Sequence, residues 1–220
     1  MKLGLFGGTF DPVHFGHLRC AEEVGELFSL DRVIFIPSYV PPHKDENGLT
    51  AYPHREAMIA LAIEGNELFT LSNVEEKRKG TSYSIDTITH FMETFGPDCD
   101  LYFIVGQDAF QEITLWKEWQ RLLTLCHIVI MTRPGYAPRG FHGILPSEVA
   151  QRFVYRRDGD RYDGPTGNTV TFRHVTFLDI SSTDIRRRIG ELRSIRYLVP
   201  DSVRYYIAEH ELYRDDQFTE

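Results

Sequence analysis

Short apolar runs alternate with amphipathic stretches along most of the chain. Arg32–Pro37 and Leu101–Val105 are apolar almost throughout, whereas Ser84–Phe95 carries its apolar residues on one helical face. A strand that is apolar on both sides needs helices on both faces of its sheet, and strands that alternate with helices form parallel sheets. The pattern therefore predicts an α/β fold, a doubly wound parallel sheet with right-handed crossovers and helices on both faces.

The same pattern places the individual elements. The expected strands are Lys2–Phe6, Arg32–Pro37, Phe69–Leu71, Leu101–Val105 and His127–Met131, with order returning over Val170–Ile180. The expected helices are Leu18–Phe28, His54–Ile63, Ser84–Phe95, Ser182–Ile189 and Pro200–His210, the last two forming a small C-terminal helical portion. Residues 137–169 are rich in Gly, Pro, Arg and Asp, so we expect an excursion there with one short helix around Pro146–Phe153. We interpret residues 1–220 as one domain that contains this excursion.

Composition and charge narrow the classes of function. The apolar fraction of 42% and charged fraction of 25% are ordinary for a globular protein, and the net charge of −8 argues against a general nucleic-acid binder. No run approaches the roughly 18 apolar residues of a membrane span, and the glycine-rich start does not resemble a signal peptide. The three cysteines lack C-x-x-C spacing, which favours a reducing compartment. We therefore expect a cytoplasmic protein without a nucleic-acid or membrane partner.

Candidate chemistry follows the first strand directly. Gly7 and Gly8 would let the backbone approach a ligand closely and take up positive φ values. His14 and His17 are three residues apart at the opening of a helix, so both imidazoles should lie on one side near its positive end. Two such donors beside free N–H groups form a phosphate site. The segment contains neither G-x-G-x-x-G nor the Gly-Lys of a P-loop.

A second phosphate-binding pattern comes near the C-terminus. Ser181-Ser182-Thr183-Asp184-Ile185-Arg186 directly follows an apolar strand. Serine or threonine at a helix start caps the helix, and the free N–H groups there can hold a phosphate. The guanidinium of Arg186 can bind a phosphate through two hydrogen bonds. We claim only Arg186 from the arginine run, whose other members fit a solvated face.

These two patterns carry a family resemblance. Gly8–His17 resembles the H-x-G-H signature of the nucleotidyltransferase superfamily, and Ser181–Arg186 resembles its second motif, S-x-T-x-x-R. The resemblance implies a Rossmann-like fold. Further segments resemble one branch, the bacterial nicotinate-nucleotide adenylyltransferases, over nearly the whole chain except the region 137–169. These segments are Ile36-Pro37, Val40–Lys44, Thr81–Ser84, Phe103–Asp108, Trp116–Trp119, Arg133–Tyr136, Tyr197–Pro200 and Leu212–Arg214.

The resemblance implies a reaction and a set of residues for it. ATP and nicotinate mononucleotide would give nicotinate adenine dinucleotide and pyrophosphate, with Mg²⁺ accompanying ATP and its protein ligands left unassigned. The implied catalytic residues are His14, His17 and Arg186. The implied ATP-binding residues are Gly7, Gly8, Thr9, Phe10, His14, His17, Gly106, Asp108, Ser181, Thr183 and Arg186. The implied mononucleotide-binding residues are His43, Lys44, Thr81, Ser82, Tyr83, Ser84, Trp116 and Arg133, with Trp116 stacking on the pyridine ring.

Other functions remain open from the sequence. One alternative is another enzyme of the superfamily, such as a nicotinamide mononucleotide or phosphopantetheine adenylyltransferase. A second is a non-catalytic nucleotide-binding regulator, although both histidines and Arg186 are present. A third, an RNA-binding relative of the class I synthetases, is disfavoured by the charge of −8. The sequence is also compatible with a homo-oligomer.

Overall fold

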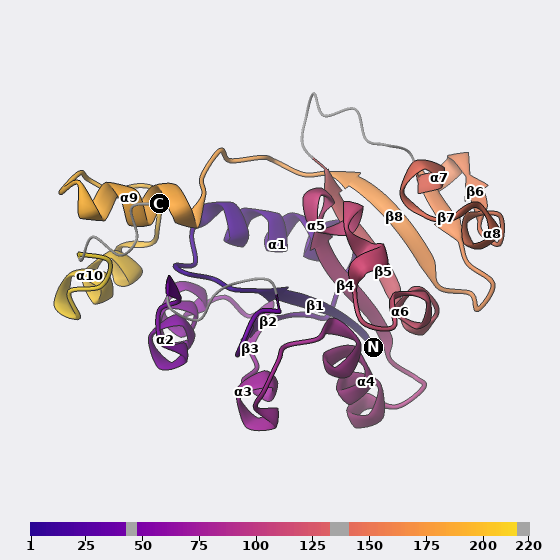
Figure 1. The fold of residues 1–220 in the computed structure, drawn as a ribbon, viewed down its shortest axis with the longest axis horizontal. Coiled ribbons are helices and arrows are strands. Elements are labelled where there is room, and N and C mark those ends of the chain that lie inside the picture. The colour runs from indigo at the N-terminus through magenta and orange to yellow at the C-terminus, as the bar shows by residue number, and fades with distance from the viewer. Residues whose placement is uncertain (43–47, 133–140, 215–220) are drawn as a thin grey trace.

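The computed structural model describes residues 1–42, 48–132 and 141–214, and these residues contain an eight-stranded sheet (Figure 1). The strands are β1 (Lys2–Gly8), β2 (Arg32–Pro37), β3 (Phe69–Leu71), β4 (Asp100–Gly106), β5 (His127–Thr132), β6 (Val154–Arg156), β7 (Arg161–Asp163) and β8 (Thr169–His174). They lie in the order β3-β2-β1-β4-β5-β8-β7-β6. The first six strands of this order run parallel, whereas β7 and β6 extend the sheet in antiparallel pairing. The predicted α/β fold is confirmed.

The direction of winding reverses between two neighbouring strands. From β1 the chain moves outward to β2 and β3, and it then returns to the other side of β1 to form β4, β5 and β8. Leu5 of β1 pairs with Ile34 of β2 on one side and with Phe103 of β4 on the other. The order β3-β2-β1-β4-β5 is that of the doubly wound nucleotide-binding fold. The carboxyl ends of β1 and β4 therefore meet at the switch point.

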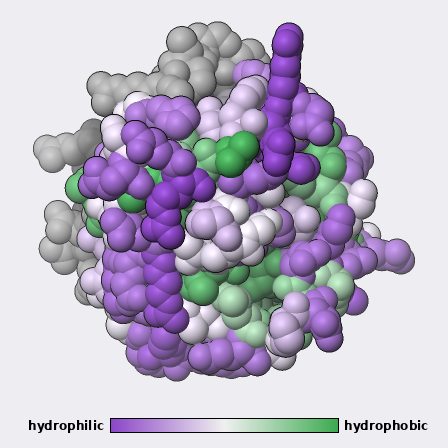
Figure 2. Space-filling model, turned by 90° about the vertical axis from the view of Figure 1, so that its right-hand side faces the viewer, coloured by the Kyte–Doolittle hydropathy of each residue, from purple (hydrophilic) through white to green (hydrophobic). Residues whose placement is uncertain are grey.

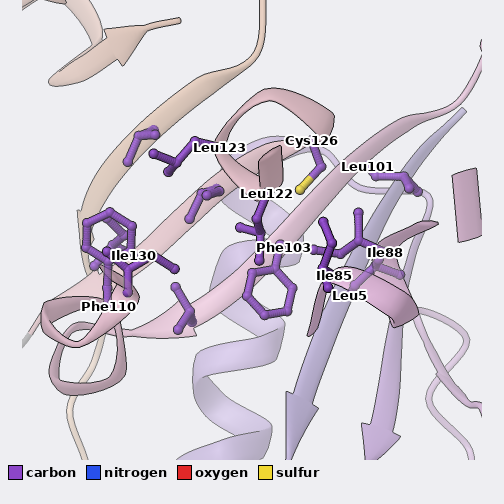
Figure 3. Close-up of a cluster of buried hydrophobic side chains, with 14 of the residues drawn as sticks. Leu5, Ile85, Ile88, Leu101, Phe103, Phe110, Leu122, Leu123, Cys126 and Ile130 are labelled. Atoms are coloured by element: carbon purple, nitrogen blue, oxygen red, sulfur yellow. The ribbon is translucent and has the colours of Figure 1, made fainter. Parts of the chain in front are cut away.

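Helices cover both faces of the sheet, so the molecule has two separate cores. Residues at alternating positions of β4 divide between them: Phe103 belongs to one cluster and Ile104 to the other. The first cluster includes α4 (Ser84–Phe95) and α6 (Trp119–Leu125), and the second includes α1 (Phe15–Phe28), α2 (Tyr52–Ile63), α9 (Ser182–Gly190) and α10 (Asp201–Glu209). Figure 3 shows the first cluster, in which the ring of Phe103 lies between Ile130 and Ile85. This two-sided burial explains the nearly continuous apolar runs.

The helix after β1 begins earlier than predicted. We expected Leu18 as its first residue, but α1 starts at Phe15 with His14 as its N-cap. The carbonyl of His14 accepts hydrogen bonds from the N–H groups of both His17 and Leu18. Both histidines therefore belong to the first turn of α1. Because the polar residues His14 and His17 interrupt the spacing of apolar residues there, the apolar pattern alone did not indicate that α1 begins at Phe15.

The excursion contains more structure than predicted. Its helices are α7 (Phe141–Ile144) and α8 (Ser147–Ala150), of which only α8 falls in the predicted range, and β6 and β7 follow with the 3₁₀ helix η3 (Arg157–Gly159) between them. Phe141 is fully buried and stacks on Tyr162 of β7, with ring centroids 4.2 Å apart. Elements of three or four residues are too short to produce a detectable period. On the side that bears the excursion, hydrophilic side chains dominate and hydrophobic ones form small patches (Figure 2).

The remaining helices are short, apart from the predicted C-terminal pair. α3 (Val74–Arg78), α5 (Gln107–Gln111), α6 and the 3₁₀ helix η2 (Ile113–Leu115) were not among the expected elements. The predicted C-terminal helices are present, and α10 packs on α2, where Ser202 Oγ donates to the carbonyl of Leu61 at 3.1 Å. No helix in the described part of the chain has the length and hydropathy needed to cross a membrane.

We predict that Leu122→Ala lowers the free energy of unfolding by about 2–5 kcal/mol, because truncation of a fully buried leucine removes apolar contacts and leaves a cavity. Leu115→Ala is the matched control, since this leucine is 72% exposed and its loss should change stability by no more than about 0.5 kcal/mol. Urea unfolding monitored by circular dichroism measures both. Equal midpoints for the two variants would contradict the assignment of α6 to the core.

Candidate active site

The residues of the first motif lie at the switch point of the sheet. β1 ends at Gly8 and β4 ends at Gly106, and these two strands are the neighbours between which the winding reverses. Ligands of open α/β sheets bind in the crevice outside the strand ends at this point. At Gly7 and Gly106, a Cβ atom would have no atom of the described residues within 4 Å, apart from those of its two chain neighbours. The backbone is therefore open to a ligand at both strand ends.

The conformation of the glycine pair differs from the prediction. Neither Gly7 nor Gly8 takes up a positive φ, because both continue β1, and the left-handed residue is instead Phe10, with φ 51°. A Cβ on Gly8 would lie 3.0 Å from the ring of Phe10. That ring is buried and packs edge-on against His17, with centroids 5.0 Å apart. The ring of Phe10 thus supports that of His17 by packing against it.

The two histidines of the motif form a stacked pair. Their ring centroids are 3.7 Å apart with an interplanar angle of 24°. The Nδ1 atom of His17 accepts a hydrogen bond from the backbone N–H of His14 at 3.2 Å. This bond assigns the hydrogen of a neutral His17 to Nε2, so that Nε2 is a donor. The sequence prediction that both rings lie on one side of the helix start is confirmed.

Gly16 has a steric role that sequence reasoning did not identify. A Cβ at this position would lie 2.9 Å from Nδ1 of His14 and 3.0 Å from its Cε1 atom. A real Cβ does not approach ring atoms so closely, and so any larger residue would displace the imidazole. The glycine between the histidines is therefore needed for the stacking of the pair.

Burial makes both imidazoles poor bases. Desolvation lowers the pKa of His14 to about 4. Burial and then the neighbouring His14 hold the pKa of His17 well below its ordinary value. Both rings are therefore uncharged at pH 7 in the ligand-free protein. They can offer N–H groups to a phosphate, but a positive charge has to come from elsewhere.

The second motif packs directly onto the first. Arg186 Nη1 donates to the carbonyl of Asp11 at 2.7 Å, and Ser182 Oγ donates to the carbonyl of Pro12 at 2.9 Å. These pairs are 175 and 170 positions apart in the chain. Ser181 caps α9 as predicted, since its side chain accepts the N–H of Asp184 at 3.1 Å. Ser182, which the sequence analysis did not assign, makes the contact with the first motif.

A buried arginine ties the walls of the site together. Arg55 of α2 is fully buried and donates to the backbone carbonyls of four residues on three neighbouring segments. These acceptors are Thr9 at 2.9 Å, Ser38 at 2.7 Å, Tyr39 at 3.3 Å and Thr50 at 2.8 Å. Burial lowers the pKa of Arg55, and the negative charge of Asp11 opposes this change. The signal in the sequence was a charged residue among the apolar positions of a helix.

The segment Thr81–Ser84 lies beside the loop that follows β2. Ser82 is buried, its N–H donates to the carbonyl of Val40 at 2.8 Å, and its Oγ accepts the N–H of Tyr39 at 2.8 Å. Ser82 therefore holds this loop in place. Thr81 forms a backbone bridge with Val40, and Tyr83 and Ser84 are half-buried at the start of α4.

The remaining predicted residues lie at or near the end of β4. Asp108 is exposed in the first turn of α5, directly after Gly106. Trp116 is half-buried, and its ring packs edge-on against Phe103 at 6.1 Å. Trp116 follows η2, whereas Trp119 begins α6. Their rings thus belong to separate elements.

Three predicted mononucleotide-binding residues, His43, Lys44 and Arg133, lie outside the described residues. Within the described ranges no three His, Cys, Asp or Glu side chains are grouped as they would be around a metal ion. A cavity of about 710 Å³ lies beside the motif turn, and it is lined by the segments 39–40 and 49–53 together with Arg55, Glu56 and Glu76. Arg55 connects this cavity to the turn, but none of the motif residues lines it.

The fold and the paired motifs define a nucleotidyltransferase, and the chain belongs to the cytidylyltransferase-like family, whose model matches residues 5–188. A probable nicotinate-nucleotide adenylyltransferase from Geotalea uraniireducens is 45% identical over 215 residues, which are 98% of this chain and 99% of the relative. The corresponding protein of Syntrophotalea carbinolica is 42% identical over 217 residues, 99% of each chain. Within the larger family the chain therefore belongs to the nicotinate-nucleotide adenylyltransferases.

Solved structures agree with this assignment at the level of the fold. A Plasmodium falciparum nicotinic acid mononucleotide adenylyltransferase complexed with NaAD has a TM-score of 0.72 at 19% identity, covering 96% of this chain and 97% of that one. A putative nicotinate-nucleotide adenylyltransferase from Vibrio parahaemolyticus has a TM-score of 0.62, also at 19% identity, covering 98% and 97%. The Rossmann-like architecture is thus shared over 96–98% of the chain.

We predict that the burial of His14 makes stability fall below pH 6.5. The unfolded chain binds a proton near pH 6.5, whereas folded His14 does so only at about pH 4. Acidification through this window therefore favours the unfolded state, by about 3 kcal/mol for this residue once the pH is below 4. Urea midpoints measured between pH 7 and pH 4 give the slope.

His14→Gln should flatten the stability slope between pH 6.5 and pH 4. His90→Gln changes an exposed histidine on α4 and is the matched control. An unaltered slope in the His14→Gln variant would contradict the assignment. An NMR titration midpoint of His14 near 6.5 would do so independently.

Proposed function

We propose that this protein transfers the adenylyl group of ATP to nicotinate mononucleotide, giving nicotinate adenine dinucleotide and pyrophosphate. The observation that carries the proposal is the junction of the two motifs: Arg186 reaches the carbonyl of Asp11 at 2.7 Å, beside the stacked histidines at the switch point. The junction brings together the guanidinium of Arg186, the neutral imidazoles of His14 and His17, and the glycine backbone at the end of β1. The full-length relatives named for this reaction support the choice of substrates.

The chemistry needs positioning more than proton transfer. A phosphate oxygen of the mononucleotide forms a bond to the α-phosphorus of ATP, and the bond from that phosphorus to the bridging oxygen of pyrophosphate breaks. The nucleophile is already ionised at pH 7, so no general base is required. Catalysis then consists of alignment and stabilisation of charge on the α-phosphate and the leaving group. Mg²⁺ enters with the triphosphate as part of the substrate and neutralises charge there.

We assign the groups that bind ATP accordingly. Nε2 of His17 donates to the α-phosphate, and His14 supports it from the adjacent ring. Arg186 supplies the positive charge that the neutral histidines lack. The backbone from Gly7 through Gly8 and Thr9 to Phe10 approaches the nucleotide. Gly106 at the end of β4 and Asp108 in the first turn of α5 contact the ribose, whose hydroxyl groups donate to the Asp108 carboxylate. The exposed N-terminus of α9, with Ser181 and Thr183, binds the outer phosphates.

Nicotinate mononucleotide is assigned to the neighbouring edge of the site. Thr81, Tyr83 and Ser84 lie at the start of α4, where backbone N–H groups and the helix dipole favour a carboxylate. Ser82 acts on this region by holding Val40 and Tyr39. Trp116 stacks on the pyridine ring, and His43, Lys44 and Arg133 are assigned to the phosphate.

Several properties of the whole protein are part of this proposal. Residues 1–220 act as one catalytic domain, the protein is cytoplasmic, and its partners are small molecules, with homo-oligomers compatible with the site. A nicotinamide mononucleotide or phosphopantetheine adenylyltransferase is the alternative. A nucleotide-binding regulator without catalytic activity is the second alternative function. Release of pyrophosphate on mixing with ATP and each acceptor distinguishes these functions.

We predict that His17→Ala lowers kcat by about 10²–10³ with the fold retained, because it removes a donor to the transition state. Since Nδ1 of His17 also caps α1, two further variants separate the roles. His17→Gln can place an amide N–H near the position of Nε2, whereas His17→Asn can place an acceptor only near Nδ1. The expected order of kcat is therefore glutamine above asparagine and alanine. Asparagine above glutamine would assign the effect to the cap.

The substrate itself gives the sharpest test of the proposed function. Donors arranged around a carboxylate oppose the NH₂ group of the amide and leave buried groups unpaired, so the acid should be preferred by roughly 10²–10⁵ in kcat/KM. A coupled pyrophosphate assay with both mononucleotides measures this ratio. Equal values for acid and amide would refute the choice of substrate and retain the nucleotidyltransferase. Trp116→Ala is the control, because stacking should serve both rings equally and leave the ratio unchanged.

A further inference from the structure

The C-terminal end of the described chain reaches back to the motif turn. Tyr213 follows α10, and its hydroxyl donates to Oδ1 of Asp11 at 2.7 Å, across 202 positions of sequence. Both side chains are only 2% exposed. Asp11 directly precedes Pro12 in the H-x-G-H motif segment. A residue at the far end of the sequence therefore contacts the turn that carries the histidines.

Asp11 connects this hydroxyl to the cation of the site. Its Oδ2 atom accepts the N–H of Thr50 at 3.2 Å, and its backbone carbonyl accepts Nη1 of Arg186 at 2.7 Å. Tyr213 thus binds the side chain of Asp11, and the main-chain carbonyl of Asp11 binds the guanidinium of Arg186. A movement of Asp11 necessarily moves the acceptor of Arg186.

The backbone on both sides of this contact is in an uncommon conformation. Tyr213 has φ 65°, and Phe10, the neighbour of Asp11, has φ 51°. Left-handed residues other than glycine are sparsely populated and persist only where the surroundings impose them. Here the burial of Tyr213 and its hydrogen bond to Asp11 compensate for the conformation. The chain is bent after α10 in a way that brings this hydroxyl to the motif.

The chemistry of the pair suits a permanent contact. Burial and then the charge of Asp11 raise the pKa of Tyr213, so the hydroxyl keeps its proton and is a donor at neutral pH. The Asp11 carboxylate is buried and requires donors to offset its desolvation. Thr50 and Tyr213 supply them, and the charge of Arg55 acts on the same group.

We propose that Tyr213 is a positioning residue for ATP: through Asp11 it sets the place of the Arg186 guanidinium and of the turn beneath the triphosphate. The C-terminal segment is then part of the nucleotide site, although Tyr213 itself touches no substrate. The proposal rests on the proposed function in one respect, the assignment of Arg186 to the triphosphate. Beyond that function, the proposal makes catalysis with ATP depend on Tyr213, at the C-terminal end of the described chain.

The test compares two tyrosines of the same C-terminal region. Tyr213→Phe removes the hydroxyl and keeps the ring, and Tyr206→Phe removes a hydroxyl that pairs with His54 Nδ1 at 3.0 Å, away from Asp11. We expect Tyr213→Phe to lower kcat/KM for ATP about ten- to a hundredfold, the range for a lost hydrogen bond to a charged group, with KM for the mononucleotide unchanged. Tyr206→Phe should leave both constants at wild-type values. Thermal unfolding confirms that both variants are folded.

Double variants separate positioning from general stability. If Tyr213 acts through Arg186, the loss for Tyr213→Phe combined with Arg186→Lys should be smaller than the product of the two single losses. The proposal would be overturned if the double variant lost the full product of the two single losses in kcat/KM for ATP. It would also be overturned if Tyr213→Phe left kcat/KM for ATP unchanged, or lowered kcat/KM equally for ATP and the mononucleotide.

Failure of the proposed function would be recognised separately. The assay uses whichever mononucleotide the wild-type protein accepts, so a preference for the amide leaves the comparison intact. If the wild type releases no pyrophosphate with any acceptor, the proposed function fails. The affinity for a non-hydrolysable ATP analogue then still tests the positioning role. We expect Tyr213→Phe to bind the analogue more weakly than Tyr206→Phe does, and equal affinities would overturn the proposal.

Discussion

The site depends on one buried guanidinium. Arg55 has no solvent-exposed surface. Its N–H groups donate to carbonyls in the turn after β1, the loop after β2 and the segment before α2. A buried charge is tolerated only when hydrogen bonds replace its hydration. The three segments must therefore keep their positions relative to one another. A change at Arg55 would therefore disturb the motif turn together with the two segments beside it.

This arrangement divides the electrostatic work between residues. The histidines are packed against Phe10 and against each other, and this packing removes their charge. In the proposed function Arg186 of α9 supplies this charge, and its guanidinium donates to the main-chain carbonyl of Asp11. A neutral pair of donors keeps its geometry through small changes of pH, whereas a guanidinium keeps its charge. In the proposed function, orientation of the phosphate and neutralisation of its charge thus come from different parts of the fold.

Local patterns in the sequence were sufficient for the parallel part of the sheet, its double winding and the pairing of the histidines, whereas the antiparallel strands β6 and β7 were not predicted. β2, β3 and α4 have the predicted bounds. β2 is buried on both faces and is therefore an almost continuous apolar run, and α4 has a clear amphipathic period. Long-range contacts were not accessible in this way. The partners of Arg55 are backbone carbonyls, the partner of Asp11 is 202 residues distant, and the need for Gly16 arises from a ring packed above it. None of these contacts has a period or a spacing that a single sequence displays.

The excursion also determines how the sheet ends. Without β6 and β7, the six-residue strand β8 would present a row of unpaired N–H and C=O groups onto which a strand of another molecule could add. β6 is instead the last strand, only three residues long, and Arg156 within it pairs with Asp163 at 3.0 Å. At the opposite end of the order, β3 is equally short. Within the described residues both edges of the sheet are therefore strands of three residues, which offer fewer free N–H and C=O groups for edge-to-edge pairing than β8 would.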